Sequence, residues 1–137
     1  MKNVTPNLMV DDVNSTANYY IKNFGFNVAT TVPDMKNPDS GKWQFAVLVN
    51  GGASLMIQSR DTLAKDIPAM KDLKTGGTFT LYFDTADVTS LFEKVKDHVN
   101  CTQGGLNDTF YGTREFTICD LNGYYLTFAQ DILEKES

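Results

Sequence analysis

The sequence contains a weak internal repeat. Residues 43–58 align without a gap with residues 114–129, and an apolar run, an Asp-Val pair and a helical pattern precede each segment. Each half is too short to bury a full hydrophobic core, so the repeat predicts two modules that pack together. The cleft between two such modules is a natural place for a ligand. The matching residues, all 71 positions apart, are Phe45 and Phe116, Val47 and Ile118, Gly52 and Gly123, and Leu55 and Leu126.

The first copy predicts a β-α-β-β-β module over about residues 4–59. Its helix is capped by Asp12 or Asn14, runs to about Asn23 and stops at Gly25. The turn signal Asn50-Gly51-Gly52 predicts a hairpin. The predicted strands are 4–10, 26–32, 44–49 and 53–58, with a polar loop at 34–42.

The second copy predicts the same module over about residues 78–130. Its strands are expected at 78–83, 98–103, 113–119 and 124–129, and its helix at 87–97. Residues 60–77 form the linker, in which Pro68 breaks a helical stretch at 62–73, and residues 131–137 form a charged tail that is expected to fray. The sequence therefore predicts a single α+β domain, residues 1–137, whose mixed sheets curve around a shared cleft with helices on the outer face.

Charge and composition exclude several classes of partner. The formal net charge of −5 argues against binding to nucleic acid or to anionic membranes. No apolar run approaches the ~18 residues of a membrane span, and no signal peptide is recognised at Met1. Cys101 and Cys119 lack metal-type or redox-type spacing and are interpreted as reduced thiols, which predicts a cytoplasmic protein.

Few residues carry the patterns of catalysis. His98 is the one histidine and falls after the second helix, so no Ser-His-Asp or Cys-His arrangement can be built. Paired acids at Asp11-Asp12 and at Asp84 and Asp87 flank helix starts, where capping explains them. The Gly-Gly pairs are interpreted as turns and not as phosphate-binding loops.

Three local runs carry a family resemblance that covers about residues 4–130. They are Val10-Asp-Asp-Val13 followed by Tyr19-Tyr20 and Phe24-Gly-Phe26; Tyr111-Gly-Thr-Arg-Glu-Phe116; and Asp120-Leu-Asn-Gly-Tyr-Tyr-Leu-Thr-Phe128. Together with the two modules they resemble the vicinal-oxygen-chelate superfamily, which includes glyoxalase I, extradiol dioxygenases, and fosfomycin- and bleomycin-resistance proteins. The run 111–116 is most similar to the bleomycin-resistance branch.

The resemblance implies four metal-ligand positions, on the first and fourth strands of each module. Enzymes of the superfamily place His, Glu or Gln there to hold a divalent metal. Threonine hydroxyls and a methionine thioether are poor ligands for such a metal. We therefore expect no metal and no cofactor at these positions, which are occupied here by Thr5, Met56, Thr80 and Thr127.

The resemblance leaves three functions open. The favoured one is a metal-free protein that binds a small molecule, such as an aromatic or cationic antibiotic, usually as a homodimer. The alternatives are a metal-dependent lyase, isomerase or dioxygenase with atypical ligands, for example Glu115, and a regulatory or interaction module with a closed cleft. Arg114 either braces the neighbouring hairpin or holds an anionic group. The expected ligand-binding residues are Trp43, Gln44, Leu48, Met56, Gln58, Tyr82, Tyr111, Arg114, Glu115 and Tyr125.

Overall fold

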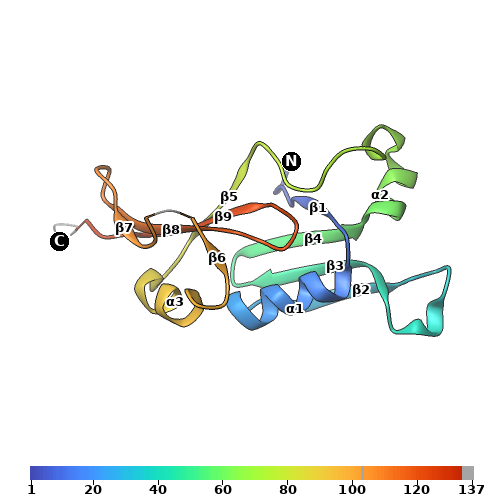
Figure 1. The fold of residues 1–137 in the computed structure, drawn as a ribbon, viewed down its shortest axis with the longest axis horizontal. Coiled ribbons are helices and arrows are strands. Elements are labelled where there is room, and N and C mark those ends of the chain that lie inside the picture. The colour runs from blue at the N-terminus through green and yellow to red at the C-terminus, as the bar shows by residue number, and fades with distance from the viewer. Residues whose placement is uncertain (103, 134–137) are drawn as a thin grey trace. The chain divides into compact units, whose positions relative to one another are not determined.

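The computed structural model describes residues 1–102 and 104–133. It divides into two compact units, Met1–Thr75 and Gly76–Ser137, and each is an α+β unit built on one mixed sheet (Figure 1). A cleft shared by the two stays a prediction. No helix among the described residues is long and apolar enough to cross a bilayer.

The first unit is a four-stranded sheet in the order β1-β4-β3-β2, with β1 parallel to β4 and the other pairs antiparallel. The helical stretch predicted at 62–73 begins two residues earlier, at Arg60, and is broken before Pro68 as predicted; a 3-10 turn begins at Pro68. The elements are β1 (Asn7–Val10), α1 (Val13–Phe24), β2 (Asn27–Pro33), η1 (Pro38–Ser40), β3 (Trp43–Asn50), β4 (Ala53–Ser59), α2 (Arg60–Asp66) and η2 (Pro68–Met70).

Helix α1 begins and ends at the predicted residues. The Asp12 carboxylate accepts a hydrogen bond from the Ser15 backbone N–H at 2.8 Å, and Gly25 closes the helix with a φ of 71°. The apolar stripe of α1 packs on one face of the sheet (Figure 1). The larger apolar side chains in this contact stabilise the fold by about 1.5–3 kcal/mol each on burial. They are Val13, Ala17, Tyr20 and Phe24 on the helix, and Ala46, Leu48, Leu55 and Ile57 on the sheet.

The second unit repeats this order as β5-β9-β8-β6, with a short additional strand, β7, that pairs with β8. The strand predicted at 98–103 is reduced to two residues, and residue 103 lies outside the described part of the chain. The elements are β5 (Thr80–Asp84), α3 (Val88–Val95), β6 (Asn100–Cys101), β7 (Asn107–Asp108), β8 (Thr113–Cys119) and β9 (Tyr125–Asp131). Of the tail predicted at 131–137, residues 134–137 also lie outside it.

Aromatic rings dominate the core of the second unit. Phe116 stacks on Phe128 with ring centroids 5.3 Å apart, and Phe128 stacks on Phe83 at 5.0 Å. Phe92 on α3 meets Phe116 edge to face at 5.2 Å. Such pairs add about 0.5–1.5 kcal/mol each beyond burial. Helix α3 therefore covers the same side of its sheet as α1 does in the first unit.

The 71-residue offset of the repeat holds for β4 and β9 but is wrong for β3 and β8. Ile57 and Phe128 keep that offset, yet they pair with Ala46 and Phe116, which are 70 positions apart. The different lengths of the two hairpin turns explain this one-residue difference in offset. Gly51 and Gly52 join β3 to β4, whereas residues 120–124 join β8 to β9 around the Asp120 carboxylate, which accepts two backbone hydrogen bonds at 2.9 Å.

Candidate ligand-binding surfaces

Each sheet has one face that lies opposite α1 or α3, called here the helix-free face; in the first unit α2 meets the end of this face at Gln58. Strand alternation and register place Met56 and Gln58 on this face of the first sheet, and Tyr82, Glu115 and Tyr125 on that of the second. These five are all expected ligand-binding residues.

Leu48 lies on the opposite side of the first sheet. It pairs with Leu55 and is fully buried on the face that packs against α1. A side chain in that position cannot touch a ligand, so the expectation that it lines a cleft is corrected. Strand β3 is apolar on both faces, which removes the alternation that distinguishes them.

A pocket of about 800 Å³ opens at one end of the first unit. Its walls are the turn from β1 to α1, the loop between β2 and β3, and the end of β4 together with α2. It brings together three expected ligand-binding residues, Trp43, Gln44 and Gln58. The volume falls within the roughly 300–1,000 Å³ of typical small-molecule sites.

Side chains at the start of α1 fix the loop that forms one wall of the pocket. The Asn14 amide group donates to the Gly41 carbonyl at 3.0 Å and accepts from the Trp43 backbone N–H at 2.9 Å. Lys42 lies 3.6 Å from the Asp12 carboxylate. The Ser15 backbone hydrogen bond lowers the pKa of Asp12, and the charge of Lys42 acts in the same direction. The loop is thus attached to the helix beside Trp43.

Gln58 connects the pocket floor to α2. Gln58 is only 8% exposed. Its side chain accepts a hydrogen bond from the Asn7 amide at 2.9 Å and donates to Thr62 at 3.2 Å and to the Asp66 carboxylate at 3.0 Å. Ser59 caps α2 by accepting from the Thr62 backbone N–H. The sheet therefore positions the Asp66 carboxylate that α2 presents to the pocket.

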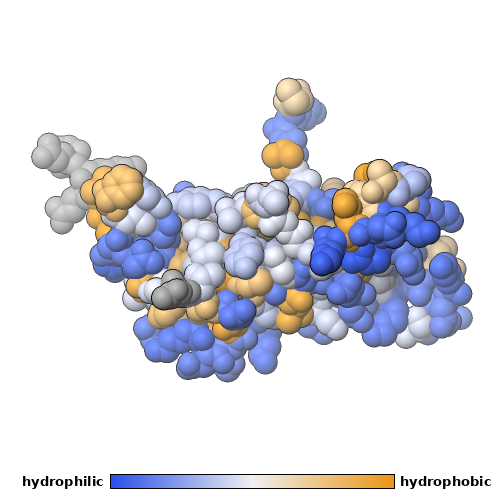
Figure 2. Space-filling model, turned by 45° about the horizontal axis from the view of Figure 1, so that its top comes forward, coloured by the Kyte–Doolittle hydropathy of each residue, from blue (hydrophilic) through white to orange (hydrophobic). Residues whose placement is uncertain are grey.

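The pocket lining is acidic. It contains five aspartates and three lysines, a formal net charge of −2. Hydrophilic side chains also gather over the end of the first unit that carries α2 (Figure 2). No local pattern in the sequence reveals this acidity, because the aspartates come from the β1–α1 turn, the β2–β3 loop and α2, which the fold brings together. The aspartates are Asp11, Asp12, Asp34, Asp61 and Asp66, and the lysines are Lys36, Lys42 and Lys65.

A second cluster lies on the helix-free face of the second unit, around Glu115. Its carboxylate accepts hydrogen bonds from Tyr111 at 2.9 Å, from Thr113 at 3.0 Å and from Tyr82 at 3.3 Å. Partial burial and the charge of Glu115 raise the pKa of Tyr82, and the hydrogen bond to Glu115 raises that of Tyr111. Both phenols therefore stay protonated donors at neutral pH. Tyr125 is 42% exposed on the same face.

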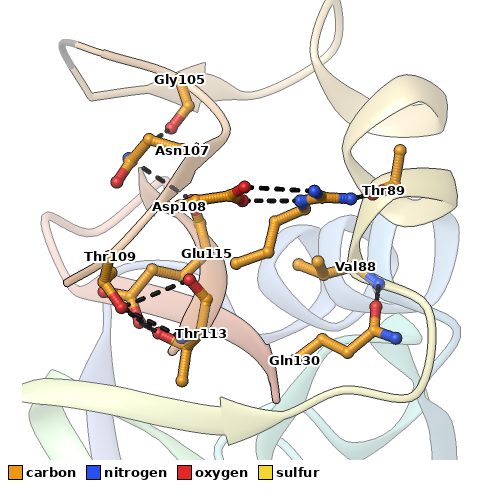
Figure 3. Close-up of polar contacts among 10 residues, drawn as sticks. Val88, Thr89, Gly105, Asn107, Asp108, Thr109, Thr113, Glu115 and Gln130 are labelled. Atoms are coloured by element: carbon orange, nitrogen blue, oxygen red, sulfur yellow. Dashed lines mark hydrogen bonds and ion pairs between the residues drawn. The ribbon is translucent and has the colours of Figure 1, made fainter. Parts of the chain in front are cut away.

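Arg114, the neighbour of Glu115 in sequence, points to the other side of the sheet. Its guanidinium group contacts the Asp108 carboxylate at 2.7 and 3.2 Å and donates to Thr89 of α3 at 3.4 Å (Figure 3). The hydrogen bond from Arg114 lowers the pKa of Asp108. In the structure Arg114 therefore connects β7 to α3 through the side chains of Asp108 and Thr89.

The four positions at which the superfamily enzymes hold their metal do not fit a divalent ion here. Met56 offers a thioether, Thr127 is buried with its hydroxyl 2.7 Å from that of Thr117, and Thr5 and Thr80 offer only hydroxyl groups. Within residues 1–102 and 104–133, no three His, Cys, Asp or Glu side chains are grouped as a metal site would require.

Comparison with known proteins identifies the family. The family described as "Glyoxalase/Bleomycin resistance protein/Dioxygenase superfamily" matches residues 4–128. An uncharacterized protein of Mycobacterium bovis is 28% identical over 138 residues, which cover 96% of this chain and 84% of that protein.

Solved structures share the fold. A protein of unknown function from Agrobacterium tumefaciens superposes with a TM-score of 0.75 at 23% identity, over 95% of this chain and 94% of that one. A glyoxalase-related enzyme from Fulvimarina pelagi superposes with a TM-score of 0.70 at 17% identity, over 95% and 88% of the two chains. With two βαβββ units and a family match over nearly its whole length, the chain belongs to the Glyoxalase/Bleomycin resistance protein/Dioxygenase superfamily.

Proposed function

We propose that this protein is a metal-independent small-molecule binding protein that sequesters an aromatic cation, such as a cationic antibiotic, in the pocket of the first unit. The observation that carries the proposal is the pocket itself, which has ligand-sized volume and collects Trp43, Gln44 and Gln58. A binding protein needs only such a preformed site with a few directed polar groups.

The lining of the pocket supports a cationic aromatic ligand. Trp43 is half-buried and offers an indole ring, the side chain that attracts a cation most strongly. Asp61 and Asp66 add negative charge from α2, and neither forms an ion pair among the described residues. An aromatic cation would therefore gain both ring contacts and charge attraction.

The donor chemistry favours a binding protein over a metal-dependent lyase, isomerase or dioxygenase. Such an enzyme would need imidazole or carboxylate ligands at positions that hold Thr5, Met56, Thr80 and Thr127. In the proposed role the ligand is held by the protein alone and leaves unchanged.

The proposal includes a cytoplasmic homodimer. Cys101 and Cys119 are both free, as expected where thiols are kept reduced. Strand β1 ends the first sheet and β5 ends the second, and such edges are commonly covered by association. Light scattering coupled to size-exclusion chromatography tests the dimer, and a monomeric mass at micromolar concentration would contradict it.

Calorimetric titration with two dyes of nearly the same shape tests the binding function. At neutral pH 9-aminoacridine is a cation and acridine is neutral. We expect the cation to bind one site per chain and acridine to bind at least about tenfold more weakly, since ring and charge contacts each contribute about 1 kcal/mol. Equal affinities, or no binding of either dye, would contradict the proposal.

Charge variants locate the site. The double variant Asp61→Asn/Asp66→Asn should weaken 9-aminoacridine binding by about tenfold or more. The matched control Asp72→Asn/Asp97→Asn changes two exposed aspartates outside the pocket and should leave the affinity unchanged. Equal weakening by both pairs would show nonspecific attraction to an acidic protein and would exclude the pocket as the site.

A further inference from the structure

Glu115 is a carboxylate without a cationic partner. Within residues 1–102 and 104–133, none of the ion pairs involves it, and the adjacent Arg114 contacts Asp108 on the other face. Its neighbours are hydroxyl groups, which donate hydrogen bonds to the carboxylate but carry no positive charge. A negative charge therefore stands on the helix-free face of the second sheet.

Aromatic side chains surround this charge and are open to solvent. Tyr82 is 57% exposed, Tyr111 is 53% exposed, and both direct their hydroxyl groups to Glu115. Phe110 is 99% exposed and meets the Tyr111 ring edge to face, with centroids 5.0 Å apart. Exposed rings beside a carboxylate attract cations through the ring faces and through charge together.

The hydrogen bonds of Glu115 restrict which cation fits. An ionised carboxylate has about four acceptor sites, and three hydroxyl groups already donate to this one. A primary amine or a guanidinium group, which brings several N–H donors, would compete with those hydroxyls. An alkylated ammonium group brings charge and apolar surface without that demand.

We propose that Tyr82, Tyr111 and Glu115 form a second ligand site, which binds a quaternary ammonium group. This site lies wholly in the second unit and does not depend on the pocket of the first. Tyr82 reaches Glu115 from β5 across β9, while Tyr111 and Thr113 reach it from the turn and strand that contain Glu115 itself. The sheet register, and not a flexible loop, thus sets most of the site.

Choline and 3,3-dimethylbutan-1-ol provide the test, because they have the same shape and differ in charge. Titrations are followed by NMR on protein with labelled tyrosine rings, whose signals are assigned with Tyr→Phe variants. We expect choline to produce saturable shifts of the Tyr82 and Tyr111 signals, and the neutral alcohol to bind at least about fivefold more weakly. Equal affinities, or shifts confined to other tyrosines, would overturn the proposal.

Charge variants then separate this site from the pocket. Glu115→Gln should weaken choline binding by about fivefold or more, while Glu93→Gln, an exposed control on α3, should leave it unchanged. Asp61→Asn/Asp66→Asn should also leave the choline-induced shifts unchanged, although it weakens 9-aminoacridine binding. A Glu115→Gln protein that keeps the wild-type melting temperature and the wild-type choline affinity would overturn the proposal.

Discussion

Replacing Gln58 with methionine tests how the pocket floor is built. The substitution keeps the length of the side chain and removes three hydrogen bonds, to Asn7, Thr62 and Asp66. The two neutral bonds contribute about 1 kcal/mol each and the bond to the carboxylate about 1.5–3 kcal/mol. A buried methionine regains about 1 kcal/mol, so the net loss should be about 2.5–4 kcal/mol.

Urea unfolding followed by circular dichroism measures this loss. A reduction of about 3 kcal/mol corresponds to a fall in melting temperature of roughly 9–15 °C for a chain of this size. The matched control is Gln44→Met, which removes one hydrogen bond, from the Met35 backbone N–H at 3.1 Å, and should lose about 1 kcal/mol or less.

Binding provides the second readout for Gln58→Met. Because Gln58 holds the Asp66 carboxylate in place, 9-aminoacridine affinity should fall together with stability. A loss of less than about 0.5 kcal/mol with unchanged affinity would refute the reasoning, because it would mean that the network does not position α2.

Three further substitutions test other parts of the structure. Leu48→Ala should lower the free energy of unfolding in urea by about 2–5 kcal/mol, because the Leu48 side chain lies in the core. The folded variant should bind the dye as the wild type does. Weaker binding with unchanged stability would instead place Leu48 at the ligand. Asp12→Asn should reduce the loss of stability at acid pH, because the pKa of Asp12 is lowered in the fold by the Ser15 backbone hydrogen bond. The contribution of Asp12 is present above its ordinary pKa and is lost as pH falls through the lowered value. In urea unfolding at stepped pH, the stabilities of wild type and variant should therefore converge below that lowered pKa. Arg114→Met should accelerate amide hydrogen exchange at Asn107 and Asp108, because the exposed ion pair between Arg114 and Asp108 anchors β7. Dye affinity should not change. Unchanged hydrogen exchange would contradict the bracing role of Arg114.

The sequence was sufficient for the module order because its strongest signals are local. Asp12 and Gly25 bound α1, Asp87 caps α3, and Gly51-Gly52 forms the first hairpin, as predicted. Capping and turn preferences depend on a few neighbouring residues, so they can be recognised without tertiary information.

Register and burial could not be predicted in the same way. The offset between β3 and β8 depends on the length of a turn at residues 120–124, and the assignment of Leu48 depends on which of two apolar faces meets α1. The Tyr82–Glu115 contact joins residues 33 positions apart through an intervening strand. Such pairings are set by the whole sheet, and no local pattern encodes them.

Metal dependence is the most direct test of the central claim. Protein purified without a histidine tag is analysed by elemental mass spectrometry, and 9-aminoacridine is titrated before and after dialysis against EDTA. We predict no stoichiometric metal and the same affinity in both titrations, because the pocket residues alone hold the ligand. One equivalent of zinc, manganese, nickel or iron, whose removal abolishes binding, would contradict the account and would favour a metal-dependent enzyme.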